Sequence, residues 1–134
     1  MTKLKVLLAD DDPRILDVIR LRLETEGYEV IPAATGHDAL QLARRHSPDA
    51  LILDINLPDG NGLTVHDRLH ARAGPWPPVI YLTGDRSLRT ELHVKMLGGF
   101  AVIYKPFDIN VLLETVGRAC RRASRAGLTP PPER

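Results

Sequence analysis

The sequence predicts an α/β fold, a doubly wound five-stranded parallel sheet with helices on both faces. Short apolar runs alternate five times along the chain with longer segments of helical periodicity. Three of the apolar runs are almost entirely apolar, as expected of strands that are covered on both faces. The 134 residues are enough for one domain with a substantial core.

The order of the strands in the sheet follows from two features of the sequence. The expected strands span Leu4–Ala9, Tyr28–Ala33, Ala50–Leu53, Val79–Leu82 and Phe100–Tyr104. The second contains Glu29 and Pro32, and we place it at an edge because proline cannot donate to a sheet ladder. The acidic residues that follow the first strand need to lie beside Asp54 at the end of the third. The predicted order is therefore 2-1-3-4-5.

The segments between and after the strands have the pattern of amphipathic helices. The expected helices span Pro13–Glu26, Asp38–Arg45, Leu63–Arg72, Ser87–Leu97 and Asp108–Arg122. The first, fourth and fifth helices have a distinct apolar face, formed by Ile15, Leu16, Ile19 and Leu23, by Leu88, Leu92 and Met96, and by Leu112, Val116 and Ala119. Asp12 before Pro13 is typical of a helix N-cap followed by proline at the first helical position.

One domain is expected over residues 1–125, followed at 126–134 by a flexible tail or the start of a linker. The prolines at 130–132 cannot continue a helix, which supports this boundary.

Composition excludes several classes of protein. The net charge of +1 predicts no general attraction to nucleic acid or to an anionic membrane. No apolar run approaches the ~20 residues of a membrane span. The single cysteine, Cys120, excludes an internal disulfide and suits a reducing cytosol. No signal peptide precedes the first strand, so we expect a cytoplasmic protein.

Charged and polar side chains follow the predicted strands at one edge of the sheet. Asp10 and Asp11 follow the first strand, and the later strands are followed by Asp54, Thr83 and Lys105. In an open parallel sheet, ligands bind beyond the carboxyl ends of the strands. Any one of these residues could simply cap a helix or end a strand, but all of them at equivalent strand ends favour a site.

The residue types at this edge point to phosphoryl chemistry with a metal ion. Clustered carboxylates repel one another, and a hard divalent cation such as Mg²⁺ relieves that repulsion. Lysine and threonine are suited to hold a phosphoryl group near the metal. Asp54 is the best candidate for a nucleophile that forms an aspartyl phosphate, because it follows a central strand with the other groups around it.

These motifs resemble those of the receiver domains of two-component response regulators, which have a flavodoxin-like fold. The resemblance covers about residues 4–122. It rests on Asp10-Asp11, on Asp54 with Pro58 and Gly62 behind it, on Thr83-Gly84, and on Lys105-Pro106-Phe107. Each motif alone is weak, whereas their order and spacing together are specific.

The resemblance implies a role for each matched residue. Asp54 would take the phosphoryl group from the phosphohistidine of a histidine kinase. Asp11, Asp54 and the backbone carbonyl of Asn56 would bind Mg²⁺, with Asp10 assisting through water. Lys105 would contact the phosphoryl oxygens and Thr83 would move to hydrogen-bond one of them. The Lys105–Pro106 bond resembles a family bond that is usually cis.

The sequence departs from the family pattern at Val102. The family often has an aromatic residue three positions before the lysine, and this residue swings inward as the threonine moves. Val102 occupies that position here. Tyr104 is not a substitute, because it directly precedes Lys105 on a strand and should face the other way.

Three functions compete on the sequence alone. The first is a phospho-accepting signalling module, which assists its own phosphorylation and dephosphorylation but is not an enzyme. The second is a phosphatase resembling the haloacid dehalogenases, whose second aspartate is replaced here by Asn56. The third is a receiver-like scaffold that only binds proteins. Val102 lends it some weight, and the intact Asp54, Asp11, Thr83 and Lys105 argue against it.

Expected partners follow from the first function. These are a sensor histidine kinase or a phosphotransfer protein. A homodimer that forms on phosphorylation is a further candidate. The face made by the fourth helix, the fifth strand and the fifth helix is expected to carry the signal. Nucleic acid is expected only through an output domain outside this sequence.

Two other patterns favour a structural role. His66 and His70 lie one helical turn apart, as in zinc proteases, but Asp67 replaces the usual glutamate and no third ligand is evident. The arginines of the last helix are interpreted as a solvated or protein-docking face and not as a nucleic-acid site.

Overall fold

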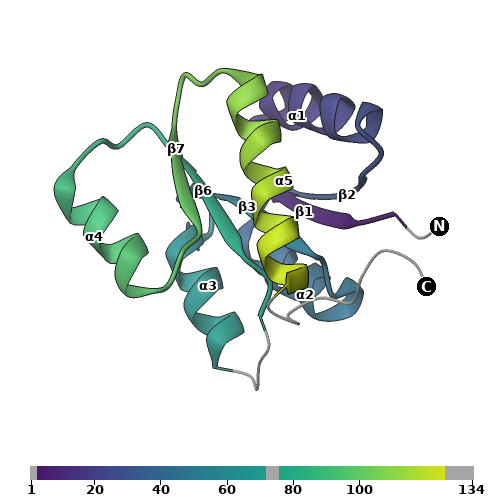
Figure 1. The fold of residues 1–134 in the computed structure, drawn as a ribbon. Helices are drawn as coiled ribbons and strands as arrows, with labels where there is room; N and C mark the ends of the chain where they lie inside the picture. Colours follow the sequence, from purple (N-terminus) through teal and green to yellow (C-terminus); the bar gives the residue numbers. More distant parts are fainter. Residues whose placement is uncertain (1–2, 72–75, 126–134) are drawn as a thin grey trace.

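The computed structural model describes residues 3–71 and 76–125, and structural statements refer to these ranges. A parallel sheet is covered by helices on both faces (Figure 1). Its strands are β1 (Lys5–Ala9), β2 (Glu29–Ala33), β3 (Ala50–Asp54), β6 (Val79–Thr83) and β7 (Ala101–Tyr104). Their spatial order is β2-β1-β3-β6-β7, with β2 at an edge. Counted by sheet strands alone, this is the predicted order.

A small hairpin that the sequence analysis did not predict follows β3. It pairs β4 (Asn56–Leu57) with β5 (Gly60–Asn61) in antiparallel fashion. Asp59 at its turn accepts hydrogen bonds from the backbone N–H groups of Gly36 and His37, at 2.7 and 2.9 Å. The hairpin therefore fixes the segment after Asp54 to the start of a neighbouring helix.

The helices form two layers. They are α1 (Pro13–Thr25), α2 (Gly36–His46), α3 (Gly62–His70), α4 (Leu88–Met96) and α5 (Ile109–Arg125). The predicted helices agree with these except at their ends, and Arg72, the predicted end of the third, lies outside the described residues. The predicted N-cap is confirmed, because the Asp12 side chain accepts the Arg14 N–H at 2.9 Å. The predicted tail at 126–134 also lies outside the described residues.

Each face of the sheet has its own apolar core. On one face α1 and α5 contribute Ile19, Leu23, Leu112, Val116, Ala119 and Cys120. On the other face α2 and α3 contribute Ala39, Leu40, Ala43, Leu63, Val65 and Leu69, joined by Tyr81 of β6 and Val94 of α4. The apolar face predicted for the fifth helix is confirmed, since Leu112, Val116 and Ala119 have no exposed surface.

The apolar face predicted for the fourth helix does not pack in the core. Leu88, Leu92 and Met96 are 68%, 51% and 84% exposed, and Val94 is the buried residue of this helix. The reason is the position of α4, which stands beside β7 at the margin of the sheet (Figure 1). The spacing correctly predicts a helix here, but α4 is only weakly amphipathic, and no described part of the chain covers the side with Leu88, Leu92 and Met96.

Candidate functional site

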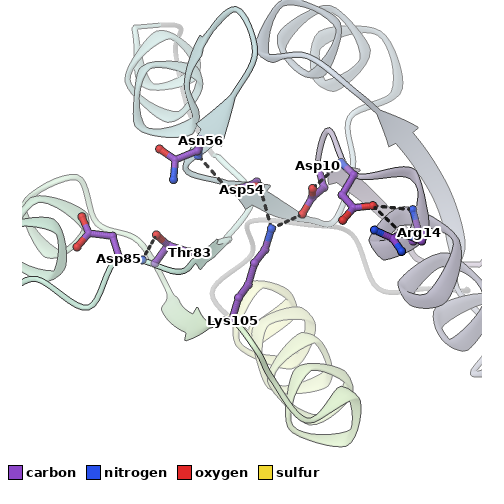
Figure 2. Close-up of polar contacts among 8 residues, drawn as sticks. Asp10, Arg14, Asp54, Asn56, Thr83, Asp85 and Lys105 are labelled. Atoms are coloured by element: carbon purple, nitrogen blue, oxygen red, sulfur yellow. Dashed lines mark hydrogen bonds and ion pairs between the residues drawn. The ribbon is translucent and has the colours of Figure 1, made fainter.

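The carboxyl ends of the central strands bring the predicted site residues together (Figure 2). Ala9 of β1 is in register with Leu53 of β3, so the residues that follow them, Asp10 and Asp54, lie side by side. Lys105 follows β7 and reaches between these two carboxylates. Its Nζ lies 2.8 Å from Asp10 Oδ2 and 2.9 Å from Asp54 Oδ2.

The second oxygen of each carboxylate is held by a backbone N–H. Asp10 Oδ1 accepts from Asp12 and Asp54 Oδ1 accepts from Asn56, each at 2.9 Å. Asp10 has no exposed surface and Asp54 is 4% exposed. Both carboxylates are therefore fixed in orientation at the bottom of the site.

Burial and charge set the protonation of this cluster. Burial raises the pKa of the Asp54 carboxyl above its ordinary value, and the hydrogen bonds from Lys105 and from the Asn56 N–H offset this only in part. Burial alone would lower the pKa of the Lys105 ammonium, but the hydrogen bonds and charges of Asp10 and Asp54 outweigh it and raise that pKa. Lys105 is thus held as a cation between its two partners.

The carboxylates also form a set of ligands suited to a hard metal ion. Asp10, Asp11 and Asp54 each offer one oxygen, and these atoms lie within 4.8 Å of one another. Asp11 is exposed while the other two are buried, so the cluster has a solvent side. Such oxygens fit Mg²⁺, which binds directly through one or two carboxylates and keeps several waters that a further carboxylate can hydrogen-bond. Asn56, the remaining predicted ligand, follows on β4 with an exposed side chain.

A glycine allows the chain to pass close to the candidate nucleophile. Gly62 begins α3, and its N–H donates to the Ile55 carbonyl at 2.9 Å. A Cβ at this position would lie 2.4 Å from the backbone oxygen of Asp54. Any other residue would therefore displace the backbone that carries Asp54, which explains the glycine in physical terms.

Thr83 ends β6 and is fully buried. Its Oγ1 accepts a hydrogen bond from the Asp85 N–H at 3.0 Å (Figure 2). The Asp85 carboxylate in turn accepts from the Ser87 N–H and from Thr90 Oγ1, at 2.9 and 2.6 Å. Asp85 was missed by the sequence analysis. Its position two residues before the helix N-cap Ser87 was the available signal.

The side chains at the end of β7 have different surroundings. Val102 is partly buried against the core on the α2 and α3 face. Lys105 reaches Asp10 and Asp54, whereas the ring of the preceding Tyr104 lies 4.7 Å from the guanidinium carbon of Arg86.

The Lys105–Pro106 bond is cis, as the resemblance implied.

The histidine pattern has a structural explanation. His66 is 1% exposed, and its Nδ1 is hydrogen-bonded to the Tyr81 hydroxyl. The side chain of His70 lies outside the described residues. Within the described ranges, Asp10, Asp11 and Asp54 form the one cluster of at least three acidic, histidine or cysteine side chains able to hold a metal.

Comparisons with known proteins agree with this geometry. The family model described as "Response regulator receiver domain" matches residues 6–117. The transcriptional regulatory protein KdpE of Mycobacterium tuberculosis is 37% identical over 121 residues, which cover 90% of this chain and 53% of KdpE. The probable transcriptional regulatory protein TcrX of the same species is 34% identical over 92% of this chain and 51% of its own length.

Solved structures share the fold. A CheY-like receiver domain protein from Methanospirillum hungatei has a TM-score of 0.87 at 32% identity, covering 94% of this chain and 100% of its own. The chemotaxis response regulator CheY4 of Vibrio cholerae has a TM-score of 0.82 at 31% identity, covering 88% of this chain and 99% of its own.

The chain spans about half the length of the first curated relatives that it matches. Within the described ranges, no helix has the length and apolar character needed to cross a membrane. The family match, the parallel sheet and the acidic cluster beside Lys105 together identify the chain as a member of the receiver domain family of two-component response regulators.

Proposed function

We propose that Asp54 accepts a phosphoryl group from the phosphohistidine of a sensor histidine kinase or a phosphotransfer protein. The observation that supports this most is the ion-paired arrangement of Lys105 with Asp10 and Asp54 beside the exposed Asp11. It brings the carboxylate of the proposed acceptor together with a cation and the proposed metal ligands at the carboxyl ends of the strands. The chain acts as a signalling domain, and it assists its own phosphorylation and dephosphorylation.

The transfer exchanges one bond to phosphorus for another. An oxygen of Asp54 forms a bond to phosphorus while the bond from phosphorus to the donor's histidine nitrogen breaks, and the electron pair of that bond stays on the nitrogen. Asn56 N–H and Lys105 Nζ hold the carboxylate in place. Lys105 then balances negative charge on the phosphoryl oxygens, and Thr83 provides a hydroxyl to one of them.

Asp10, Asp11 and Asp54, with the backbone carbonyl of Asn56, would hold Mg²⁺. When bound, the ion neutralises the carboxylates and the charge of the phosphoryl oxygens. The burial of Asp10 and Asp54 favours such a cation, because buried carboxylates with few compensating charges are unstable.

Asp54→Asn tests the assignment of the acceptor. We expect acetyl phosphate with Mg²⁺ to label the wild-type chain and beryllofluoride to bind it, and we expect both to fail with Asp54→Asn. Asp67→Asn is a matched control that changes an exposed aspartate of α3 outside the cluster, and it should be labelled normally. Equal labelling of Asp54→Asn, measured by intact-protein mass spectrometry, would show that another carboxylate is the acceptor.

Asp11→Asn tests the metal site separately. The expected result is a weaker Mg²⁺ affinity with an unchanged circular dichroism spectrum, because one ligand charge is lost from an exposed position. An unchanged metal titration would argue against the ligand set.

An apolar groove beside the site supports a docking position for the phosphodonor. It is lined by Ile15 and Val18 of α1, by Phe107 from the connection after Lys105, and by Ile109 at the start of α5. Asp12 and Arg14 lie at the same groove. An amphipathic helix laid along it would bring its histidine toward Asp54, which is the kind of helix-in-groove contact used by many partners.

The signal is proposed to leave through the face formed by α4, β7 and α5. Leu88, Leu92 and Met96 expose an apolar side of α4, and Arg118 and Arg121 of α5 are exposed as well. We propose that a second copy of the phosphorylated chain covers this face.

The proposed function also implies the bounds of the domain and its location in the cell. Residues 1–125 are the receiver domain, residues 126–134 are a tail or linker, and the protein acts in the cytoplasm. Any contact with nucleic acid would be made by an output domain outside this sequence.

A further inference from the structure

The loop between β6 and α4 is tied to both of its neighbours by side-chain contacts. Thr83 Oγ1 accepts from the Asp85 N–H, and the Asp85 carboxylate accepts from Thr90 Oγ1 of α4 at 2.6 Å. Ser87 caps α4 by accepting the Thr90 N–H at 3.3 Å. Thr83, the loop and the first turn of α4 therefore form one hydrogen-bonded unit.

A second contact joins this loop to β7. The guanidinium carbon of Arg86 lies 4.7 Å from the centroid of the Tyr104 ring, which is within the range of a cation–π interaction. Tyr104 is in register with Thr83 on the neighbouring strand and directly precedes Lys105. The contact thus connects the loop that follows Thr83, the proposed switch residue, with the strand that precedes Lys105, the proposed phosphate-binding residue.

We propose that the Arg86–Tyr104 contact holds the loop in its resting position and so sets how readily the domain adopts its phosphorylated conformation. This inference rests on the proposed function of Asp54 and Thr83. When Thr83 turns toward a phosphoryl group, its bond to the Asp85 N–H draws the loop with it. Arg86 follows Asp85 in the chain, and it must then leave the Tyr104 ring.

Val102 packs against the core on the α2 and α3 face, whereas Tyr104 contacts Arg86 of the loop. A contact made only in the resting state favours that state, and its removal shifts the population toward the other. A cation–π pair at an exposed site corresponds to roughly two- to fivefold in an equilibrium constant.

The test measures the affinity of the full chain and its variants for beryllofluoride in the presence of Mg²⁺, by isothermal titration calorimetry. Arg86→Ala and Tyr104→Leu should each bind beryllofluoride roughly two- to fivefold more tightly. Tyr104→Phe keeps the ring and should match the wild type. The double variant Arg86→Ala/Tyr104→Leu should be no tighter than either single variant, because both remove the same contact.

Arg89→Ala is the matched control for charge, since it removes an exposed arginine of α4. It should leave the affinity unchanged. Unchanged or weaker binding in Arg86→Ala, or equal tightening in Arg89→Ala, would overturn the inference. Arg86 is exposed and its variant should fold, so the result does not depend on Tyr104→Leu.

The two levels of the proposal can fail separately. Beryllofluoride binding that survives Asp54→Asn would remove the proposed function and this inference with it. Binding that depends on Asp54 but is insensitive to Arg86 would leave the proposed function standing and remove only the restraint.

Discussion

Helices α5 and α4 both carry apolar residues at helical spacing, but α5 is strongly amphipathic and α4 only weakly so, and only α5 buries its apolar face. Leu112 and Val116 of α5 have no exposed surface, whereas Leu88 and Met96 of α4 are 68% and 84% exposed. The difference is one of position, because α5 lies across the sheet and α4 stands beside β7 (Figure 1). Periodicity reports that a helix has an apolar side, and the topology decides whether that side meets the core.

The two helices also differ in how many buried contacts hold them to the sheet. The described core contacts of α4 centre on Val94, and its first turn is tied to Thr83 through Asp85. Few buried contacts mean a low free energy of local opening. In the proposed switch, a helix held in this way would shift with Thr83 while Asp10 and Asp54 keep their positions at the ends of β1 and β3.

The largest expected effect tests the buried side of the comparison. Leu112→Ala should lower the free energy of unfolding by about 2–5 kcal/mol, because it leaves a cavity in the core. Leu92→Ala on α4 should change it by no more than about 0.5 kcal/mol, because Leu92 is 51% exposed. Urea denaturation followed by circular dichroism measures both. Similar losses for the two variants would mean that α4 is packed as firmly as α5.

Gly99→Ala should have the next largest effect, because it disturbs the buried anchor of α4. A Cβ at Gly99 would lie 2.5 Å from Val94 Cγ1 and 3.0 Å from the Tyr81 ring. Overpacking of this kind costs about 1–3 kcal/mol. Hydrogen exchange should accelerate in α4 more than in α5.

Gly84→Ala is the control for that variant, since a Cβ there would meet nothing within 4 Å. Its stability should stay close to that of the wild type. Unchanged exchange in α4 of Gly99→Ala would show that Val94 does not anchor the helix.

The exposed apolar side of α4 gives the third prediction. If a second copy covers it after phosphorylation, Leu92→Glu should weaken beryllofluoride-dependent dimerisation roughly tenfold or more, because a charge would be buried in the interface. Leu21→Glu on α1 is a matched control, since Leu21 is 64% exposed on a different face. Light scattering coupled to size exclusion measures both. Equal weakening by the two variants would place the interface elsewhere.

Much of this arrangement could be predicted from the sequence. The strands, their order and the convergence of Asp10, Asp54 and Lys105 follow from fully apolar runs that end in charged residues. Each of these features is encoded in a short segment, and the geometry of a parallel sheet then brings the carboxyl ends of the strands together at one edge. The cis Lys105–Pro106 bond came only from the resemblance to a family.

Other features depend on three-dimensional placement and could not be read from the chain. The β4–β5 hairpin has strands of two residues each, too short for a periodic signal. The exposure of α4 depends on where the segment between β6 and α4 positions the helix relative to the sheet. The contact of Arg86 with Tyr104 joins two segments whose proximity only the fold determines.

The smallest expected effect uses Cys120, which lies on the buried side of α5. Burial, with a smaller contribution from Asp49, raises the pKa of its thiol from an ordinary value of 9.0 to about 11. As the pH rises through this window the unfolded chain loses the thiol proton first, so the folded state loses stability. The expected loss is about 1 kcal/mol by pH 10. Cys120→Ala lacks this titration, and comparing its urea unfolding with that of the wild type at pH 8 and pH 10 isolates the thiol from the tyrosines and lysines. An identical pH dependence in both chains would mean that the thiol reaches solvent and that α5 is less firmly packed than Leu112 and Val116 indicate.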